Sequence, residues 1–418
     1  MSARSNSWSP RDNFERVLLA AALGIVIFIG SWAALHQGWL ARGQIIDTPV
    51  YEKYGNLMAQ GEVPYRDFSV EYPPGALPVF VLPALGHVGD SARFRRSFET
   101  LMAVCGSLLV IGVALSLGAL GASPRRLWGG VALAGISPLL VGSVILTRFD
   151  LYPAAIAICA LAALLRGRLR FGHGLLGLAI VTKIWPGVLL PLTVAHVWRT
   201  RGRREALACL GTGVATMAVI LLPFVALSPS GVWDSVVRQT TRPLQIESLG
   251  AALLVASHHV FGTGAAMVSS HGSQNLGGTA AGVAGVLQTL AQVGVLLALW
   301  IWFARRSRSR EELVQACAAA VVAFIALGKV VSPQYMIWLI PFIPLVRKRI
   351  AAALFVAGLA LTQAWFPQRY WGYALDFNGT TTAIVLARDL VLLALLGVLL
   401  MPERRVSAAA RAAAARAR

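Results

Sequence analysis

The run VLLAAALGIVIFIGSWAAL at Val17–Leu35 contains no charged side chain and is long enough to cross a bilayer as one helix. Three further runs share this character: Leu101–Leu120, Leu207–Leu227 and Val283–Phe303. Over the 418 residues, 57% are hydrophobic, only 13% are charged and the mean hydropathy is +0.67. About a quarter of the residues in a soluble domain are charged, so this chain has too few polar groups to cover a surface in water. The sequence therefore predicts an all-α fold, a polytopic transmembrane helical bundle.

The positive charge is concentrated in short arginine clusters between the apolar runs. The formal net charge is +19 at pH 7. Arginine-rich loops of this kind are typical of the cytoplasmic side of a multispanning protein, so we expect membrane lipids as partners and no nucleic acid. Because Arg4, Arg11 and Arg16 precede the first apolar run, the N-terminus is expected in the cytoplasm. The clusters are Arg125–Arg126, Arg166–Arg170, Arg199–Arg204, Arg305–Arg310, Arg347–Arg349 and Arg404–Arg405.

Alternation of the apolar runs with these clusters predicts a multi-pass protein of the cell membrane. It gives about 10–12 membrane helices, two cytoplasmic termini and two long extracytoplasmic segments, residues 36–96 and 228–280. Two segments have alternatives. Ala76–Leu85 either spans or lies at the interface, and Gly174–Trp198 is either one span or a pair of half-helices that meet around Lys183. We expect one membrane-embedded domain over residues 1–405 and a basic cytoplasmic tail over 406–418.

Polar side chains outside the arginine clusters concentrate in or beside the segments predicted to be extracytoplasmic. Ionisable groups near membrane depth cost free energy and therefore mark functional sites. A carboxylate can deprotonate an acceptor hydroxyl, cations can stabilise a leaving phosphate and aromatic faces can stack on sugars, so the pattern predicts glycosyl transfer from a phosphate donor. The candidates are Asp47, Asp67, Glu71, Asp150, Glu247, Arg148, Lys183, Arg238, Arg242, Lys329, Tyr51, Tyr54, Tyr65, Tyr72, Tyr335 and Gln334.

Most of these candidates also have a purely structural interpretation. Asp47 fits an ordinary turn, and Arg148 fits an ion pair with Asp150 at a helix end. Lys183 and Lys329 are harder to explain this way, because each lies in apolar sequence and needs a partner. Further alternatives are ion pairs of Asp67 and Glu71 with Arg66, headgroup contacts of Arg238 and Arg242 at i,i+4 spacing, and a structural role for His258–His259, which lacks further metal ligands. We expect no metal and no cofactor.

Several motifs give the chain a specific resemblance. They are Asp47-Thr-Pro-Val-Tyr51, Gly61-Glu-Val-Pro-Tyr65-Arg-Asp67, Glu71-Tyr-Pro-Pro74, Arg148-Phe-Asp150, Thr182-Lys183-Ile-Trp-Pro186, Glu247-Ser-Leu249 and Ser332-Pro-Gln-Tyr335-Met-Ile-Trp338. In order and topology they resemble the polyprenol-phosphate-mannose-dependent transferases of glycosyltransferase family 87. The resemblance implies a GT-C fold, an inverting reaction on the extracytoplasmic side and Asp47 as the catalytic base. Where that family often has a Gly-Gln-x-Asn-type stretch, this chain has Thr147-Arg-Phe-Asp150, a departure that bears on donor or acceptor identity.

Residues and resemblance together predict a membrane glycosyltransferase. It is expected to move a hexose, by resemblance mannose, from a polyprenyl-phosphate donor to a lipid or glycan acceptor. Asp47 is the expected base, with Asp67 and Glu71 as alternatives, and the cations expected at the donor phosphate are Lys183, Arg238, Arg242 and Lys329. Tyrosines 51, 54, 65 and 72 are expected to stack on sugars. The alternatives are a transporter or lipid flippase, which would show repeated halves, and a non-catalytic partner in cell-envelope assembly.

Overall fold

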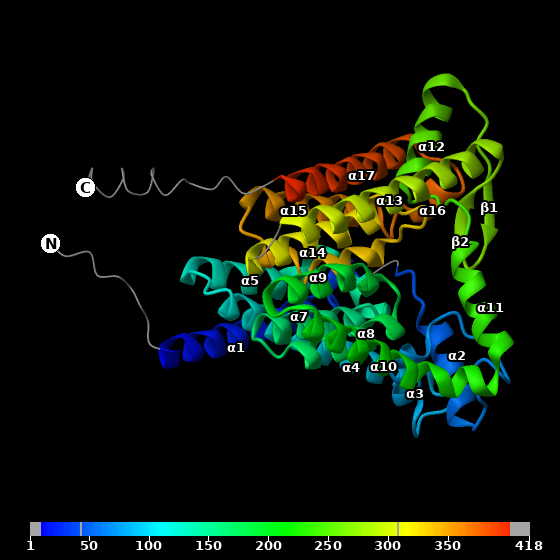
Figure 1. Ribbon diagram of the computed structural model, residues 1–418. Helices are drawn as coiled ribbons and strands as arrows, with labels where there is room; N and C mark the ends of the chain where they lie inside the picture. The colour runs from blue at the N-terminus through cyan, green and yellow to red at the C-terminus, as the bar shows by residue number, and fades with distance from the viewer. Residues whose placement is uncertain (1–9, 42–43, 307–308, 402–418) are drawn as a thin grey trace, which may run out of the picture.

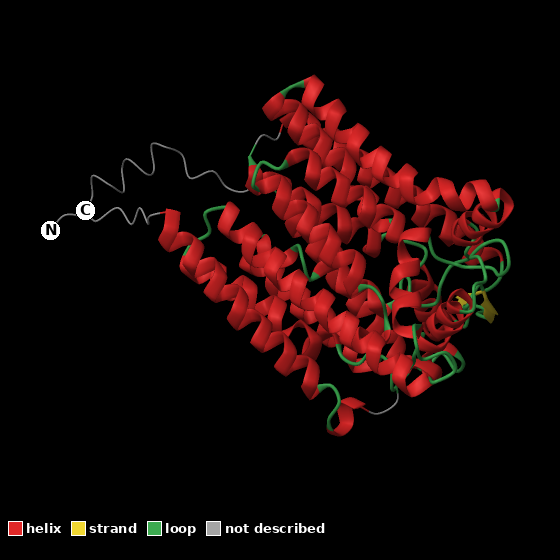
Figure 2. Ribbon diagram, turned by 90° about the horizontal axis from the view of Figure 1, so that it is seen from below, coloured by secondary structure: helices red, strands yellow, loops and turns green. Residues whose placement is uncertain are grey.

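The computed structural model describes residues 10–41, 44–306 and 309–401. The predicted tail at 406–418 and the boundary at 405 lie outside the described residues. Nearly all of the described secondary structure is helical, apart from one hairpin of two short strands (Figure 2). The helices run side by side, and those from the first half of the chain lie below those from the second half in Figure 1.

The lower layer begins with α1 (Pro10–Ala34), which packs against both α4 (Ser91–Ala119) and α5 (Pro124–Val141). In turn, α4 packs against α7 (Leu151–Leu165). Small residues allow these close approaches: a Cβ placed on Gly106 of α4 would lie only 2.0 Å from the ring of Phe28 on α1. Lipid provides no hydrophobic force between helices, so close packing of this kind holds the layer together.

Residues 174–198, predicted as either one span or a pair of half-helices, form two short helices joined by a turn. Helix α8 (Leu169–Thr182) ends at Lys183, and a 3-10 turn η3 (Trp185–Leu189) leads into α9 (Leu190–Arg201). Arg170 at the start of α8 pairs with Glu205 at the start of α10 (Arg203–Leu227), 2.8 Å between Nη2 and Oε2. Only Gly202 separates α9 from α10. The start of α8 and the end of α9 therefore lie at the same end of the bundle, and Lys183 lies at the turn between them.

The upper layer consists of α13 (Thr279–Arg306), α14 (Arg310–Ala326), α15 (Arg349–Trp365) and α17 (Gly379–Leu400). Helix α17 packs against both α14 and α15. Between α14 and α15, the apolar stretch 335–346 does not form an α-helix. It forms the 3-10 turns η4 (Pro333–Leu339) and η5 (Ile343–Leu345) instead, because Pro333, Pro341 and Pro344 remove backbone donors that an α-helix needs.

The short elements gather at one end of the bundle, which we call the loop end. Helix α1 begins and α17 ends at the opposite, terminal end (Figure 1). The short apolar helix α3 has eight residues and is about 12 Å long, so the segment 76–85 does not span. Apart from α3 (Leu77–Ala84), the loop end carries η1 (Gly38–Ala41), α2 (Thr48–Ala59), η2 (Pro74–Ala76), α6 (Val144–Thr147), α11 (Pro229–Thr240), α12 (Leu249–Phe261), β1 (Met267–Ser270), β2 (Ser273–Leu276) and α16 (Tyr370–Ala374).

The prediction of an all-α polytopic bundle is confirmed. Within the described residues, five helices are long and apolar enough to cross a membrane by themselves: Asn13–Ala34, Ser91–Ala119, Arg203–Leu227, Thr279–Arg306 and Gly379–Leu400. Helices of 10–17 residues such as Leu151–Leu165 and Arg349–Trp365 complete the bundle between them.

Candidate active site

A cavity of 270 Å³ at the loop end collects polar residues from seven separate stretches of the chain. We call it the central cavity. It brings together eight of the residues predicted from the sequence: Asp47, Glu71, Tyr72, Arg148, Arg242, Glu247, Gln334 and Tyr335. Gln245, close to Glu247 in the sequence, lines it as well. Ser332, Gln274 and Tyr370 complete much of its wall. This convergence from distant parts of the sequence is what a binding site requires.

Asp47 lies at the N-terminus of α2, where aspartate usually caps the helix. Its side chain makes no capping hydrogen bond. The carboxylate instead contacts Nη1 of Arg148, and it remains 31% exposed while the arginine side chain is 7% exposed. Asp47 is therefore held at the wall of the central cavity by a buried cation and stays accessible to a substrate.

Arg148 does not pair with its near neighbour Asp150, so the structural interpretation of that pair is wrong. The Asp150 carboxylate is fully buried, and its Oδ1 accepts hydrogen bonds from Lys183 Nζ at 2.6 Å and Trp338 Nε1 at 2.5 Å. Lys183 also lies 4.6 Å from the centre of the Phe149 ring. The two charges of this pair therefore balance each other, although Asp150 Oδ2 has no hydrogen-bond partner within the described residues. Lys183 does not line the central cavity, which places it away from a donor phosphate.

Tyr51 and Tyr54 form an aromatic core beneath the cavity rather than its wall. The Tyr51 side chain is fully buried and its ring is stacked on Phe80, with 4.8 Å between ring centroids. Tyr72 lies at the top of this core, 4.9 Å from Phe149, and reaches the central cavity. Of the four tyrosines expected to stack on sugars, Tyr72 alone lines this cavity in the part of the chain that the structure describes.

Tyr65, Asp67 and Arg238 line a separate, smaller cavity of 210 Å³ between the first outer segment and α11. Asp67 accepts two hydrogen bonds from Arg66, at 2.8 and 2.9 Å. The hydrogen bonds from Arg66 lower the pKa of Asp67 to about 2, with help from the backbone N–H of Val63. Asp67 thus has the ion pair with Arg66 that its spacing suggested. Because α11 ends at Thr240, Arg238 and Arg242 do not share a helix face.

The segment Leu244–Ser248 forms one side of the central cavity and is held like an extra strand beside the hairpin. The N–H of Ile246 donates to the carbonyl of Gln274 at 3.1 Å, and the N–H of Leu276 donates to the carbonyl of Leu244 at 2.9 Å. On the other side, the N–H of Gln245 donates to the carbonyl of Lys329 at 2.9 Å. These bonds fix the direction in which Gln245 and Glu247 face the cavity.

Glu247 is 2% exposed, and burial raises its pKa to about 7, against the opposing influence of Arg388 and Arg242. Its Oε2 has no hydrogen-bond partner within the described residues. Buried polar atoms are normally satisfied, so an orphaned group in a cavity indicates a missing ligand or water. The same holds for four other atoms of residues that line this cavity: Arg148 Nε, Arg242 Nε, Gln245 Oε1 and Gln274 Oε1.

Two charged residues near this site were not among the sequence candidates. Arg388 and Asp389 are both buried in α17, and Arg388 Nη2 donates to the carbonyl of Glu247 at 2.6 Å. The signal was present in the sequence, since an arginine–aspartate pair interrupts an otherwise apolar run. No three His, Cys, Asp or Glu side chains come together as metal ligands among the residues that the structure describes.

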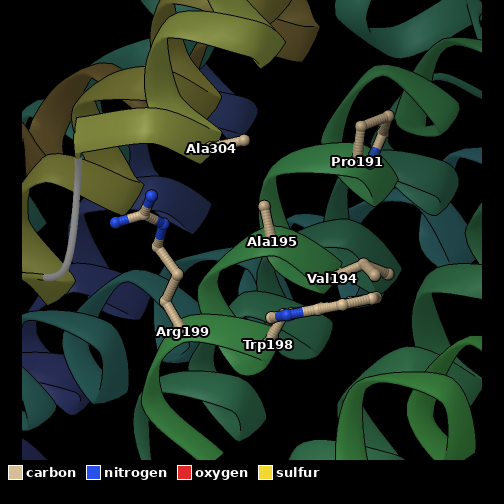
Figure 3. A pocket seen from close by; sticks show the side chains of 6 residues that line it. All are labelled: Pro191, Val194, Ala195, Trp198, Arg199 and Ala304. Atoms are coloured by element: carbon tan, nitrogen blue, oxygen red, sulfur yellow. The ribbon is translucent and has the colours of Figure 1, made fainter. Parts of the chain in front are cut away.

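Cavity volume alone does not locate the site. A larger hollow of 630 Å³ lies between α9 and the last turns of α13 (Figure 3). Its lining is mostly apolar: Pro191, Val194, Ala195, Trp198 and Ala304, with Arg199 at one side. Arg199 donates to the carbonyl of Arg305 at 2.8 Å. None of the residues predicted to carry chemistry lines this hollow.

Comparison with known proteins identifies the family. The sequence model of glycosyltransferase family 87 matches residues 70–333, more than half of the chain. The chain belongs to glycosyltransferase family 87. The predicted membrane glycosyltransferase activity is thereby confirmed, and the transporter alternative is not favoured. A second model, described as mannosyltransferase (PIG-M), matches residues 270–401 of this family 87 enzyme.

One curated relative and two solved structures are similar to this glycosyltransferase. A polyprenol-phosphate-mannose-dependent alpha-(1-2)-phosphatidylinositol mannoside mannosyltransferase of Mycolicibacterium smegmatis is 26% identical over 372 residues, which are 80% of this chain and 78% of the relative. ArnT from Cupriavidus metallidurans, solved bound to undecaprenyl phosphate, matches with a TM-score of 0.47 at 18% identity, over 92% of this chain and 77% of ArnT. The Archaeoglobus fulgidus oligosaccharyltransferase matches with a TM-score of 0.46 at 14% identity, over 94% and 55% of the two chains.

The family 87 match contains most of the central cavity. Glu71, Arg148, Arg242 and Glu247 all lie within residues 70–333. Asp47 precedes the matched range, so its role rests on its place in the cavity and on the motif around it.

Proposed function

We propose that this enzyme transfers a hexose, namely mannose, from a polyprenyl-phosphate donor to a lipid or glycan acceptor at the central cavity. The observation that carries the proposal is the convergence of an accessible carboxylate, Asp47, with the buried cation Arg148 and the half-buried cation Arg242 in one cavity. The Mycolicibacterium smegmatis relative is named for polyprenol-phosphate-mannose as donor, and the second family model is a mannosyltransferase. Both support mannose as the sugar.

In the proposed reaction, Asp47 accepts the proton of an acceptor hydroxyl as that oxygen forms a bond to the anomeric carbon. The bond from the anomeric carbon to the phosphate oxygen breaks, and the phosphate leaves with the electron pair. Attack opposite the leaving group inverts the anomeric configuration. A positioned base contributes roughly 100- to 10,000-fold, and cations at the leaving phosphate stabilise the charge that develops there.

Glu71 is the alternative base that the geometry supports best, because its side chain also lines the central cavity. Asp67 is less well placed, since it lines a different cavity and both of its oxygens accept hydrogen bonds from Arg66. Asp47 is preferred because its contact with Arg148 lies beside the orphaned Arg148 Nε, where a polar substrate group would be bound.

We propose that the donor's lipid chain reaches this cavity along a neighbouring groove. Arg242 lines both the central cavity and a 520 Å³ groove along α13. Lys329 lines the same groove. Lys329 Nζ donates to the carbonyl of Thr240 at 3.2 Å. The groove continues over Gly285, Val286 and Leu290. Val286 is 60% exposed and Leu290 is 63% exposed, so the groove presents apolar surface. We assign the phosphate to Arg242 and Lys329 and the isoprenyl chain to this groove.

We place the loop end, and with it the reaction, on the extracytoplasmic side, and both termini in the cytoplasm. The arginine clusters support this orientation: Arg166–Arg170, Arg199–Arg204 and Arg305–Arg310 follow or precede helix ends at the terminal end of the bundle.

Purified protein incubated with a panel of radiolabelled polyprenyl-phosphate sugars and a membrane lipid extract tests the proposal. The expected result is a labelled lipid or glycan product from mannosyl donor, with no product from a soluble nucleotide sugar. Product formed only from the nucleotide sugar would overturn the assignment of the donor. Labelled product from a different polyprenyl-phosphate hexose would leave the reaction in place and correct the sugar.

A further inference from the structure

Helix α17 carries a charged pair in the middle of an apolar span. The Arg388 side chain is 0% exposed, and its Nε lies 2.7 Å from Oδ1 of Asp389. The guanidinium also lies over the Trp365 ring, 5.9 Å from its centroid. A buried ion pair contributes little net stability, because the loss of hydration offsets the attraction between the charges. Its presence in a membrane helix therefore needs a different explanation.

The pair is connected directly to the wall of the central cavity. Arg388 Nη2 donates to the carbonyl oxygen of Glu247 at 2.6 Å. From α16, the Tyr373 hydroxyl donates to the carbonyl oxygen of the preceding residue, Ile246, at 2.8 Å. Two consecutive carbonyls of the segment Leu244–Ser248 thus accept hydrogen bonds from α16 and α17. The β1–β2 hairpin forms backbone hydrogen bonds with the same segment.

These contacts hold the backbone of Glu247 and leave an oxygen of its carboxylate available to a ligand. The backbone of Glu247 is fixed, yet its Oε2 has no partner within the described residues and the side chain lines the cavity. A carboxylate with a fixed backbone and an unoccupied acceptor oxygen is suited to accept hydrogen bonds from sugar hydroxyls. The fixed position also matters, because a displacement of about 1 Å at a site can cost on the order of 100-fold in rate.

We propose that Arg388 is a positioning residue, which with Tyr373 holds the segment Leu244–Ser248 so that the Glu247 carboxylate binds hydroxyl groups of the transferred hexose. The identity of that ligand rests on the proposed function; the positioning contact itself does not. Asp389 orients Arg388, and neither residue touches the substrate.

The charge of Arg388 also acts on Glu247. Burial raises the pKa of Glu247 and Arg388 opposes that rise, so removal of the arginine would leave more of Glu247 protonated at neutral pH. A protonated carboxyl has less capacity to accept hydrogen bonds. The charged and titratable groups that act on or alongside Glu247 come from five elements or segments: Arg388, Arg242, Arg148, Tyr370, Tyr373 and Tyr335.

The test uses the double variant Arg388→Gln/Asp389→Asn, which removes both charges and leaves neither buried ion without a partner. A matched control removes a comparable pair at the terminal end: Arg126, which binds Glu311 at 2.6 Å and also donates to the carbonyl of Leu345. The control variant is Arg126→Gln/Glu311→Gln. Both variants and Glu247→Gln are purified in the same detergent or nanodiscs and compared at equal folded fraction.

Three results are expected. The double variant Arg388→Gln/Asp389→Asn, called the α17 variant, loses on the order of 100-fold in kcat/KM for the donor. Adding Glu247→Gln to it reduces kcat/KM little further, because both changes remove the same interaction. Its acid limb in the pH profile moves to higher pH than in the wild type, and this limb is absent in Glu247→Gln. Hydrogen exchange at residues 244–248 increases in the α17 variant and not in the Arg126/Glu311 control.

Additive losses with Glu247→Gln and an unchanged acid limb would overturn the proposal and leave Arg388 as a folding residue only. If the wild type transfers no polyprenyl-phosphate sugar, the proposed function fails. The hydrogen-exchange comparison then decides the positioning contact by itself, since it needs no substrate. Unchanged exchange at residues 244–248 in the α17 variant would overturn the positioning contact whatever the reaction is.

Discussion

Lys183 Nζ lies 2.6 Å from Asp150 Oδ1, and this contact joins the turn between α8 and α9 to the start of α7. The same oxygen accepts a hydrogen bond from Trp338 Nε1 at 2.5 Å. Three motifs that are far apart in the sequence therefore meet at one buried carboxylate. The arrangement lies next to the central cavity, because Lys183 Nζ is 5.8 Å from the centre of the Tyr335 ring and Tyr335 lines the cavity.

We predict that Lys183→Met destabilises the protein more than it weakens donor binding. The change leaves the buried Asp150 carboxylate without its cation, and loss of one partner of a buried pair typically costs about 3–5 kcal/mol. Thermal unfolding in detergent measures the effect. The double variant Lys183→Met/Asp150→Asn should recover much of the stability, because it removes the unpaired charge as well. An unchanged melting temperature combined with a large rise in donor KM would instead return Lys183 to the donor site.

Asp47→Asn should fold and bind donor but lose turnover by roughly 100- to 10,000-fold, because the amide cannot accept the proton of the acceptor hydroxyl. Single-turnover assays with a mannosyl polyprenyl phosphate measure the loss. Asp67→Asn is the matched control, since Asp67 lies outside the central cavity, and it should retain most activity. An inactive Glu71→Gln with a nearly normal Asp47→Asn would transfer the role of the base to Glu71.

Replacement of Arg242 or Lys329 by Met should reduce kcat/KM for the lipid-phosphate donor by about 100-fold or more, since each removes a cation from the leaving phosphate. Arg238→Met provides the comparison, because Arg238 is exposed and lines the smaller cavity. Steady-state assays over a range of donor concentrations separate the three variants. Equal losses in all three would indicate a general effect of positive charge at the loop end rather than a phosphate site.

Glu247 predicts a pH dependence of stability. Burial raises its pKa from 4.5 to about 7, so the folded state holds a proton that the unfolded state has already released between these values. Stability is therefore highest below about pH 4.5 with respect to this group and decreases as the pH rises to about 7, by an amount on the order of 3 kcal/mol. Melting temperatures of wild type and Glu247→Gln, compared between pH 5 and 8, isolate the effect. Parallel pH curves for the two proteins would show that Glu247 is not the group responsible.

Single-cysteine labelling tests the orientation of the bundle. In a variant without the four native cysteines, Ser69→Cys and Asn378→Cys should react with an impermeant reagent applied from outside the cell, because both residues are exposed at the loop end. Ser123→Cys, between α4 and α5 at the terminal end, should react only after the membrane is permeabilised. The reverse pattern would place the central cavity on the cytoplasmic side.

The sequence by itself determined the class of fold, because hydrophobic runs and arginine clusters report directly on the bilayer as solvent. It also predicted the aspartate, glutamate and arginine residues that line the central cavity, including Asp47, Arg148, Arg242 and Glu247, because charged groups in or beside apolar runs are rare and costly. The half-helix alternative for residues 174–198 was likewise visible in the arginine clusters at both of its ends.

Only the tertiary structure decided which of these polar groups face a substrate and which satisfy one another. Sequence spacing suggested an ion pair between Arg148 and Asp150. Side chains pair by distance in space, however, and in the folded chain Arg148 pairs with Asp47 while Asp150 pairs with Lys183. The contacts of Tyr51 and Arg388 could not be predicted from the sequence either. A tyrosine in an outer segment looks exposed until helices pack over it, and an arginine in a membrane helix has no visible partner until a distant carbonyl, that of Glu247, is placed against it.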